Sequence, residues 1–399
     1  MNDRKNDNLS RKDFEEPQAV PVRHGALKRA ALLLVTLVAV LGIVLAAAYW
    51  DLSNFDSVRR LFIYNKVEQD ESGRAQLYNY DNDRSNLFAK LGSRLVVVST
   101  TRVSILSDDG TEVFSQPVKL TNPGISCGGK TVAVYDIGGT EFYVFGEKGL
   151  VRDMSAVSEN GLTSVKLNSS DYMAVVTDKS GYKSAVSIYN TAGELVFALN
   201  SSASYILDAC CERDCKGVAV VVMGEKEGAF ESTVVRYSFD SESPVSSCAM
   251  EDTLILTLES INQSLVALSD DRFAALAKDG SLAGAYLYSY PYLQDYTLSG
   301  TDFGAVVLSR YRSGSTSRVV TLRADGTMLA SFETQKEVVD ISACGHYLAV
   351  LYDDSLIIYT SELEEYATLS DTQYARAVLM NDDGTALLLG ATEGWLFIP

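Results

Sequence analysis

The feature of this 399-residue chain that most constrains its fold is a short apolar segment that recurs along most of its length. Eight copies share a near-continuous run of β-forming residues, and their starts are 37, 41, 45, 55, 31, 44 and 38 residues apart. Apolar runs of this length predict strands that are buried on both faces of a sheet. The copies are RLVVVST from Arg94, TVAVYD from Thr131, YMAVVTD from Tyr172, GVAVVVM from Gly217, RFAALAK from Arg272, FGAVVLS from Phe303, YLAVLYD from Tyr347 and TALLLGA from Thr385.

Further β-rich segments accompany each copy and are separated from it by tight turns. Turns such as Asp109-Gly110 and Ala192-Gly193 supply the positive φ that a hairpin needs. About four strands in each unit of roughly 42 residues, without a helical period, are typical of a propeller blade. We therefore predict an all-β fold, a β-propeller with eight blades. Seven blades is the alternative, because the 55-residue and 31-residue intervals are irregular.

The two ends of the repeat region indicate how the ring closes. The last unit stops at Pro399 directly after GWLFI and has no outer strand, whereas Ala75–Asp81 reads as a strand with no unit of its own. Donating this segment to the last blade would hide two sheet edges, which closed β folds require. We predict that Ala75–Asp81 completes the last blade.

A long apolar run near the N-terminus predicts a membrane anchor. Ala30–Trp50 forms 21 positions without a charge, enough for a helix of roughly 30 Å, the thickness of a bilayer core. Seven bases and five acids precede the run, and 27 bases and 47 acids follow it. Because positive charge stays on the cytoplasmic side, we predict a single-pass protein of the cell membrane with residues 51–399 outside. A signal peptide cleaved near Ala46-Ala47-Ala48 is the alternative.

The segment between the anchor and the propeller predicts a stem. Phe55, Val58 and Phe62 fall at helical spacing on one face, and Ser53 can cap the helix. We expect a short helix that holds the propeller close to the membrane. The predicted parts are a basic cytoplasmic tail at 1–29, a transmembrane helix at 30–50, a stem at 51–74 and a propeller at 75–399.

The composition argues against several classes of function. With 52 acids, 34 bases and a net charge of −18, the chain lacks the basic surface that nucleic acid requires. The only histidines are His24 and His346, and there is no C-x-x-C pair, so neither a metal site nor a catalytic triad is indicated. We predict no cofactor and no catalytic residues.

Two clusters remain as candidate sites. In the fourth unit, Cys211, Cys215 and Cys248 lie close in sequence, and an oxidising exterior would favour a disulfide among them.

Four tyrosines alternate in the sequence AYLYSYPYLQDY. Period two places their rings on one face if a single strand runs through them, although Pro291 acts against that. Such a face could stack on a sugar ring or a peptide, which would make it a partner-binding face, and packing between blades is the alternative. The residues are Tyr286, Tyr288, Tyr290 and Tyr292.

The repeat and its turn pattern, an apolar residue followed by x-x-Asp/Ala-Gly-x-x and a second apolar residue, resemble those of quinoprotein-like and WD40-like propellers. That group includes the lipoprotein of the outer-membrane β-barrel assembly machine. The arrangement of basic tail, one apolar run, short stem and acidic propeller resembles a Gram-positive bacterial family of unknown function. This resemblance implies a fold and a topology and assigns no role to any residue.

These observations favour a non-catalytic interaction, scaffold or sensing module of the bacterial cell envelope. The acidic balance suits a cationic partner, and an envelope protein, a peptide or a glycan are all open as the partner. The alternative is an envelope enzyme, a hydrolase or lyase on a glycan, with carboxylates that face the channel. Convergent, desolvated carboxylates in the channel would favour that alternative.

Overall fold

The computed structural model describes residues 24–48, 52–65, 67–226, 228–312, 314, 316–372 and 374–399. The chain divides into two compact units, Met1–Phe55 and Asp56–Pro399. The first unit contains helix α1 (His24–Ala48), and helix α2 (Leu52–Ile63) crosses the boundary between the units. Within the described residues, no helix combines the length and the apolar character that crossing a membrane takes. The expected span Ala30–Trp50 ends outside the described residues, at Tyr49 and Trp50.

The second unit is a propeller of eight four-stranded antiparallel sheets, as the described residues show. The first strands of consecutive blades contact one another at every boundary except that of β18 and β22, so the first strand of each blade lies innermost. From inside to outside, the strands of blades 1 to 4 are β2 (Leu87–Leu91), β3 (Arg94–Val98), β4 (Arg102–Leu106), β5 (Glu112–Pro117); β6 (Pro123–Cys127), β7 (Thr131–Asp136), β8 (Phe142–Gly146), β9 (Gly149–Asp153); β10 (Leu162–Leu167), β11 (Met173–Thr177), β12 (Ser184–Tyr189), β13 (Leu195–Ser201); and β14 (Tyr205–Cys211), β15 (Gly217–Lys226), β16 (Ala229–Ser238), β17 (Pro244–Glu251).

Blades 5 to 8 follow the same order, and a short 3-10 helix, η1 (Ser155–Val157), links blades 2 and 3. Their strands are β18 (Ile255–Ile261), β19 (Ser264–Ser269), β20 (Arg272–Leu276), β21 (Leu282–Leu287); β22 (Tyr292–Thr297), β23 (Phe303–Ser309), β24 (Ser317–Arg323), β25 (Met328–Thr334); β26 (Val338–Cys344), β27 (Tyr347–Tyr352), β28 (Ser355–Thr360), β29 (Glu365–Ser370); and β30 (Ala377–Met380), β31 (Ala386–Leu389), β32 (Glu393–Phe397) with β1 (Arg74–Asn79).

The predicted count of eight blades is confirmed, and the structure explains why the spacing looked irregular. Seven of the eight repeated segments are second strands, but RFAALAK from Arg272 is the third strand of blade 5. The second strand of that blade is β19, which starts at Ser264. Periodicity alone does not tell whether a short apolar run is the second or the third strand of its blade, because both strands are buried on two faces.

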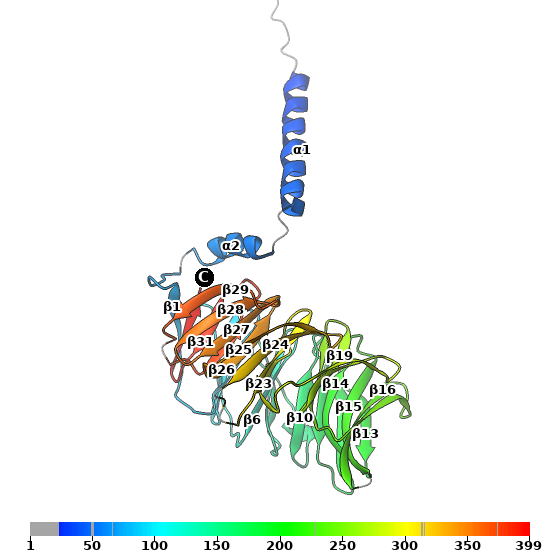
Figure 1. Ribbon diagram of the computed structural model, residues 1–399. Coiled ribbons are helices and arrows are strands. Elements are labelled where there is room, and N and C mark those ends of the chain that lie inside the picture. Colours follow the sequence, from blue (N-terminus) through cyan, green and yellow to red (C-terminus); the bar gives the residue numbers. More distant parts are fainter. Residues whose placement is uncertain are drawn as a thin grey trace, which may run out of the picture. The chain divides into compact units, whose positions relative to one another are not determined.

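Ring closure by the N-terminal strand is also confirmed. Strand β1 pairs antiparallel with β32, with Ala75 opposite Leu396, and forms the outer strand of blade 8. In Figure 1 the blue strand β1 lies beside the red C-terminal strands. Ala75 and Tyr78 of this strand are buried, so the contact combines a hydrogen-bonded ladder with apolar packing.

The core of the propeller lies between neighbouring blades. Each apolar cluster joins side chains of two consecutive sheets, as where Tyr347 and Leu351 of blade 7 pack with Leu388 of blade 8. The second strands carry most of this surface, and β27 and β23 are buried along their whole length. This burial is why the repeated segments lack polar alternation.

Candidate functional site

The innermost strands of blades 3 to 7 share one irregularity that shapes the channel. Each contains a β-bulge near its start. A bulge inserts one extra residue and re-aims the side chains that follow it. The residue directly after the bulge is polar in all five strands: Ser164, Asp208, Thr257, Asp295 and Asp340.

Three of these residues bind the backbone of the next blade. Asp208 accepts the N–H of Leu258 at 2.8 Å, Asp295 accepts that of Ile341 at 3.1 Å, and Asp340 accepts that of Val378 at 2.7 Å. A carboxylate on one inner strand thus satisfies an inner-strand donor across the blade boundary.

Residues two positions further along make a second set of such bonds. Thr297 accepts the N–H of Ala343 at 3.1 Å, and Ser342 accepts that of Met380 at 3.0 Å. Two side chains therefore join the inner strands by hydrogen bonds at the boundary of blades 6 and 7, and two more do so at the boundary of blades 7 and 8.

Blades 3, 4 and 5 meet instead at a buried ion pair. The Lys166 ammonium lies 2.6 Å from a carboxylate oxygen of Asp208 and also donates to Thr257 and to the carbonyl of Leu258. Ser164 donates to the other oxygen of Asp208 at 2.7 Å. Burial opposes the charge on Lys166, but the carboxylates of Asp208 and Glu259 outweigh it and raise the pKa of Lys166. The pair is therefore charged and hydrogen-bonded on both sides.

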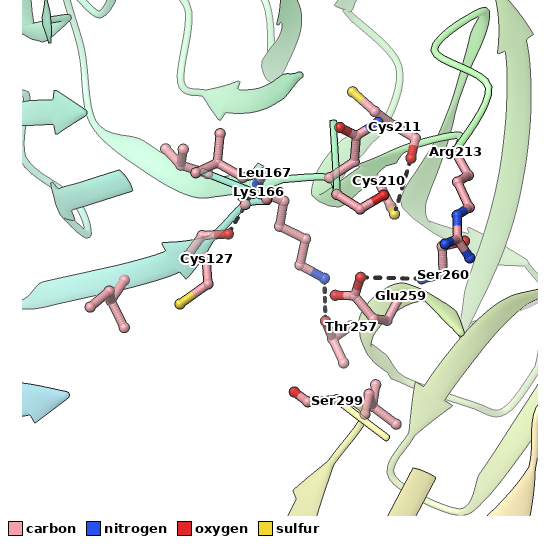
Figure 2. A pocket seen from close by; sticks show the side chains of 18 of the residues that line it. Cys127, Lys166, Leu167, Cys210, Cys211, Arg213, Thr257, Glu259, Ser260 and Ser299 are labelled. Atoms are coloured by element: carbon pink, nitrogen blue, oxygen red, sulfur yellow. Dashed lines mark hydrogen bonds between the residues drawn. The ribbon is translucent and has the colours of Figure 1, made fainter. Parts of the chain in front are cut away.

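At the boundary between blades 5 and 6, the innermost strands β18 and β22 contact each other less than the innermost strands do at any other boundary in the described residues. In the described part of the chain, no side chain of β18 or β22 bonds the backbone of the other strand there, and a cavity of about 820 Å³ opens between these strands and those of blades 2 to 4. Glu259 of β18 occupies the position that Thr297 and Ser342 use for cross-blade bonds, yet it faces the cavity (Figure 2).

Glu259 is the one carboxylate among the described residues that line this cavity. It accepts one backbone N–H, from Ser260 at 3.2 Å. Burial raises the pKa of Glu259, and Lys166 lowers it in part. Figure 2 shows the Lys166 ammonium and the Glu259 carboxylate at the same side of the cavity, with Arg213 and Ser299 at its edges.

The other carboxylates of the inner strands named above are bound by groups of the protein itself. Asp208 is saturated by Lys166, Ser164 and Leu258, and Asp295 and Asp340 bind neighbouring blades. Within the described ranges, no three His, Cys, Asp or Glu side chains are grouped so that they could hold a metal ion.

The four tyrosines singled out in the sequence do not lie on one strand. Tyr286 is near the end of β21, Tyr292 begins β22, and Tyr288 and Tyr290 lie in the connection between them. Pro291 thus separates two blades, as a proline without an N–H favours. Whether the tyrosines bind a partner stays a prediction.

The environments of these tyrosines also differ. Tyr288 packs among core residues of blades 5 and 6, and its buried hydroxyl has no hydrogen-bond partner among the described residues. Tyr290 donates to Glu333 at 2.7 Å, and its ring lies below the guanidinium of Arg318 at 5.1 Å. Tyr292 is 39% exposed. Tyr286 and Tyr290 are partly buried against the same apolar cluster as Tyr288, so Tyr292 is the most exposed of the four.

All six cysteines are free thiols in the structure. Cys211 ends the innermost strand of blade 4, whereas Cys248 lies on the outermost strand, three strands away. Strands are about 4.8 Å apart, so these Cα atoms are separated by roughly 14 Å, beyond the reach of a disulfide. The sheet order therefore separates Cys248 from Cys211, and Cys215 lies in the turn after β14. Whether a disulfide forms among Cys211, Cys215 and Cys248 stays a prediction.

The sequence pattern does not identify the polar residues of the channel, which are Lys166, Asp208 and Glu259. Polar residues in inner strands resemble ordinary solvent-facing positions in the sequence. One signal was available, because Asp208 and Asp340 occupy matching places in SYILDAC and EVVDISAC. Their matching position indicates a recurrent structural role, but it does not show that Glu259 faces a cavity.

Comparison with solved structures confirms the fold. The C-terminal WD40 domain of Sif2 matches with a TM-score of 0.59 and 16% identity, over 82% of this chain and 98% of that chain. The Dos1 propeller matches with a TM-score of 0.55 and 12% identity, over 80% and 95%. BamB from Moraxella catarrhalis matches with a TM-score of 0.53 and 12% identity, over 82% and 100%. These likenesses concern the fold alone.

Sequence comparison gives the family. No curated protein matches the chain. One family model matches residues 63–385, which is most of the chain and nearly all of the propeller. The chain therefore belongs to the family of unknown function DUF5711.

Proposed function

We propose that this protein is a membrane-anchored, extracytoplasmic propeller of the bacterial cell envelope that binds a partner in its channel cavity without converting it chemically. The observation that supports non-catalytic binding is the hydrogen-bonding of the channel carboxylates. Asp208, Asp295 and Asp340 are all engaged by the protein itself, so no second free carboxylate lies beside Glu259 among the described residues. A glycoside hydrolase of the usual kind needs two such carboxylates.

The proposed partner carries cationic or hydrogen-bond-donating groups. Glu259 presents an acceptor in a partly desolvated cavity, where a charge-assisted hydrogen bond is stronger than in water. The 47 acids and 27 bases of residues 51–399 would attract a basic segment toward the propeller before it docks. A basic peptide segment of an envelope protein fits both properties.

The anchor and its orientation rest on the sequence. The uncharged run Ala30–Trp50 and the basic excess before it support an N-terminus in the cytoplasm. Protease added to intact cells should remove residues 51–399 and leave a small protected N-terminal fragment. Protection of the large part would contradict this orientation.

A photocrosslinking experiment tests the cavity. A photoreactive phenylalanine analogue at Ser169, an exposed residue that lines the cavity, should capture a discrete adduct in intact cells. The same analogue at Tyr182, which is 46% exposed in the turn between β11 and β12, serves as the control and should capture none. Glu259→Gln should reduce capture at Ser169, whereas Glu194→Gln in an exposed turn should not.

Two results would contradict the proposal. Equal capture at Ser169 and Tyr182 would show that the cavity is not the binding site. Recovery of the captured molecule in a chemically cleaved form would favour the envelope enzyme instead.

A further inference from the structure

The stem helix α2 attaches to the propeller through its polar side. Asp56 accepts a hydrogen bond from the Tyr347 hydroxyl at 2.9 Å, and Arg60, one turn later, donates to the carbonyl of Asp383 at 2.6 Å. Both helix residues are buried, at 9% and 6% exposure. Positions four apart lie on one helix face, so this polar face is the docking side of the helix.

Two further contacts extend the same docking side. Arg59 pairs with Asp382 at 3.2 Å, and the hydroxyl of Tyr64, just after the helix, donates to Asp383 at 3.1 Å. The part of the helix from Asp56 onward is therefore held by charged and polar contacts to blades 7 and 8.

The apolar residues of the helix point away from the propeller. Leu61 is 71% exposed and Phe62 is 74% exposed. At 100° per residue they lie about 140° and 240° around the helix from Asp56, opposite the docking side. The sequence places Phe55 and Val58 on the same face as Phe62, and their side chains lie outside the described residues. Of the apolar stripe expected from the sequence, Phe62 is therefore exposed and does not form the contact with the propeller.

The helix docks on the same face of the propeller as the turns that line the cavity. Tyr347 and Asp383 follow the innermost strands β26 and β30. The cavity residues Asn168, Arg213 and Asn262 follow the innermost strands β10, β14 and β18. Innermost strands run in the same direction in every blade, so the turns after them all lie on one face of the ring.

We propose that α2 is an interfacial helix whose apolar side, with Leu61 and Phe62, lies in the membrane surface and turns the cavity-bearing face of the propeller toward the bilayer. This inference rests on the proposed membrane anchorage. Residues 49–51, between α1 and α2, span at most about 10–15 Å, so a helix that follows the membrane anchor directly must begin at the headgroup level. A polar docking side opposite an apolar side is the pattern of helices that lie in the interface plane.

The consequence concerns the partner of the cavity. A molecule that enters from this face comes from the membrane side, for example an extracellular segment that emerges from another membrane protein. The apolar side of α2 and the turns that line the cavity then both lie on the face of the propeller that is turned toward the bilayer.

Tryptophan fluorescence in brominated lipid tests the inference on the full chain. Phe62→Trp in a Trp50→Phe background is reconstituted into 3:1 phosphatidylcholine–phosphatidylglycerol vesicles, with or without bromine on the phosphatidylcholine acyl chains. Bromine quenches tryptophan by contact, so we expect the added emission to fall at least about twofold in brominated vesicles. Leu61→Trp provides a second probe on the same side, and thermal melting confirms that each variant folds.

Phe230→Trp is the matched control. Phe230 is 71% exposed, close to the 74% of Phe62, and it lies at the β15–β16 hairpin, on the opposite face of the ring. Its emission should be unaffected by bromine. Equal and weak quenching at positions 61, 62 and 230 would overturn the inference, and so would chemical crosslinking of α2 to a second copy without lipid quenching.

Failure of the anchorage is distinguishable from failure of this inference. Alkaline carbonate extraction of wild-type membranes measures the anchor alone. If the protein is washed off, the proposed anchorage fails, whereas retention without quenching at position 62 shows that only the assignment of α2 is wrong.

Discussion

Blades 3 to 5, which we call the first half, and blades 6 to 8, the second half, both use inner-strand carboxylates to bind the next blade. The two halves differ in whether a cation pairs with the carboxylate. In both halves a carboxylate after the inner-strand bulge accepts a backbone N–H from the next blade. In the first half Asp208 has the Lys166 ammonium at 2.6 Å. In the second half no cation pairs with Asp295 or Asp340 among the described residues, and burial raises their pKa values to about 6 and about 7.

The difference shows that a repeated position does not imply a repeated charge state. Where a lysine is supplied, the buried acid forms an ion pair. Where it is not, desolvation raises the pKa of the carboxyl toward neutral, and for Asp340 the charge of Asp295 adds to this rise. Blades 3 to 5 line most of the cavity, together with parts of blades 2 and 6. Blades 7 and 8 contain the ring closure and the docking site of α2.

The largest expected effect concerns ring closure in the second half. Replacing residues 74–79 of the full chain by a Gly/Ser segment removes the outer strand of blade 8 and exposes the edge of β32. We expect aggregation or loss of a single cooperative unfolding transition, because an unpaired edge recruits other strands. A Gly/Ser replacement of the exposed turn Lys179–Tyr182 is the control, and calorimetry is the measurement. Identical melts would refute the need for β1.

The second prediction concerns the ion pair of the first half. Lys166→Met leaves the Asp208 carboxylate buried and without its cation, which should lower the free energy of unfolding by about 3–5 kcal/mol. Adding Asp208→Asn should recover part of this loss, because the neutral amide needs no cation. Urea unfolding of the single and double variants measures the coupling. Additive losses would mean that the two side chains do not act as a pair.

The third prediction concerns the pH dependence of the second half. The pKa of Asp340 is about 7 in the folded chain and about 4 when unfolded, so the folded state binds its proton more tightly. Its contribution to stability is complete below about pH 4 and is lost as pH rises through 7. Asp340→Asn can still accept the N–H of Val378, and it should flatten the stability profile between pH 4 and 7 by a few kcal/mol. An unchanged profile in urea unfolding would show that Asp340 is ionised throughout.

The smallest expected effect lies at the boundary between the two halves. Tyr292→Ala removes a ring that is 39% exposed and should change the free energy of unfolding by no more than about 0.5 kcal/mol. Tyr288→Ala, in the core between blades 5 and 6, should cost about 3–5 kcal/mol and serves as the reference. Thermal melting compares them. A large loss at Tyr292 would remove it as a candidate binding residue.

The sequence predicted most of the fold because its signals are local. Apolar β-forming runs at regular spacing indicated eight blades, and an orphan strand at Ala75–Asp81 indicated the closure that β1 makes. The error concerned strand order. RFAALAK is the third strand of blade 5 and not its second strand. Proximity in sequence also hides the two strands, β15 and β16, that lie between Cys211 and Cys248.

By itself the sequence determined the blades, because burial of a strand on two faces requires apolar side chains wherever the strand is placed. Only the tertiary structure decided the site. Glu259 faces a cavity that strands of several blades line, and Lys166 meets Asp208 from 42 residues away. Likewise, the side of α2 that packs on the propeller was set by Tyr347 and Asp383, far along the chain. Such contacts depend on where distant strands end in the ring, and no local pattern of residues encodes that.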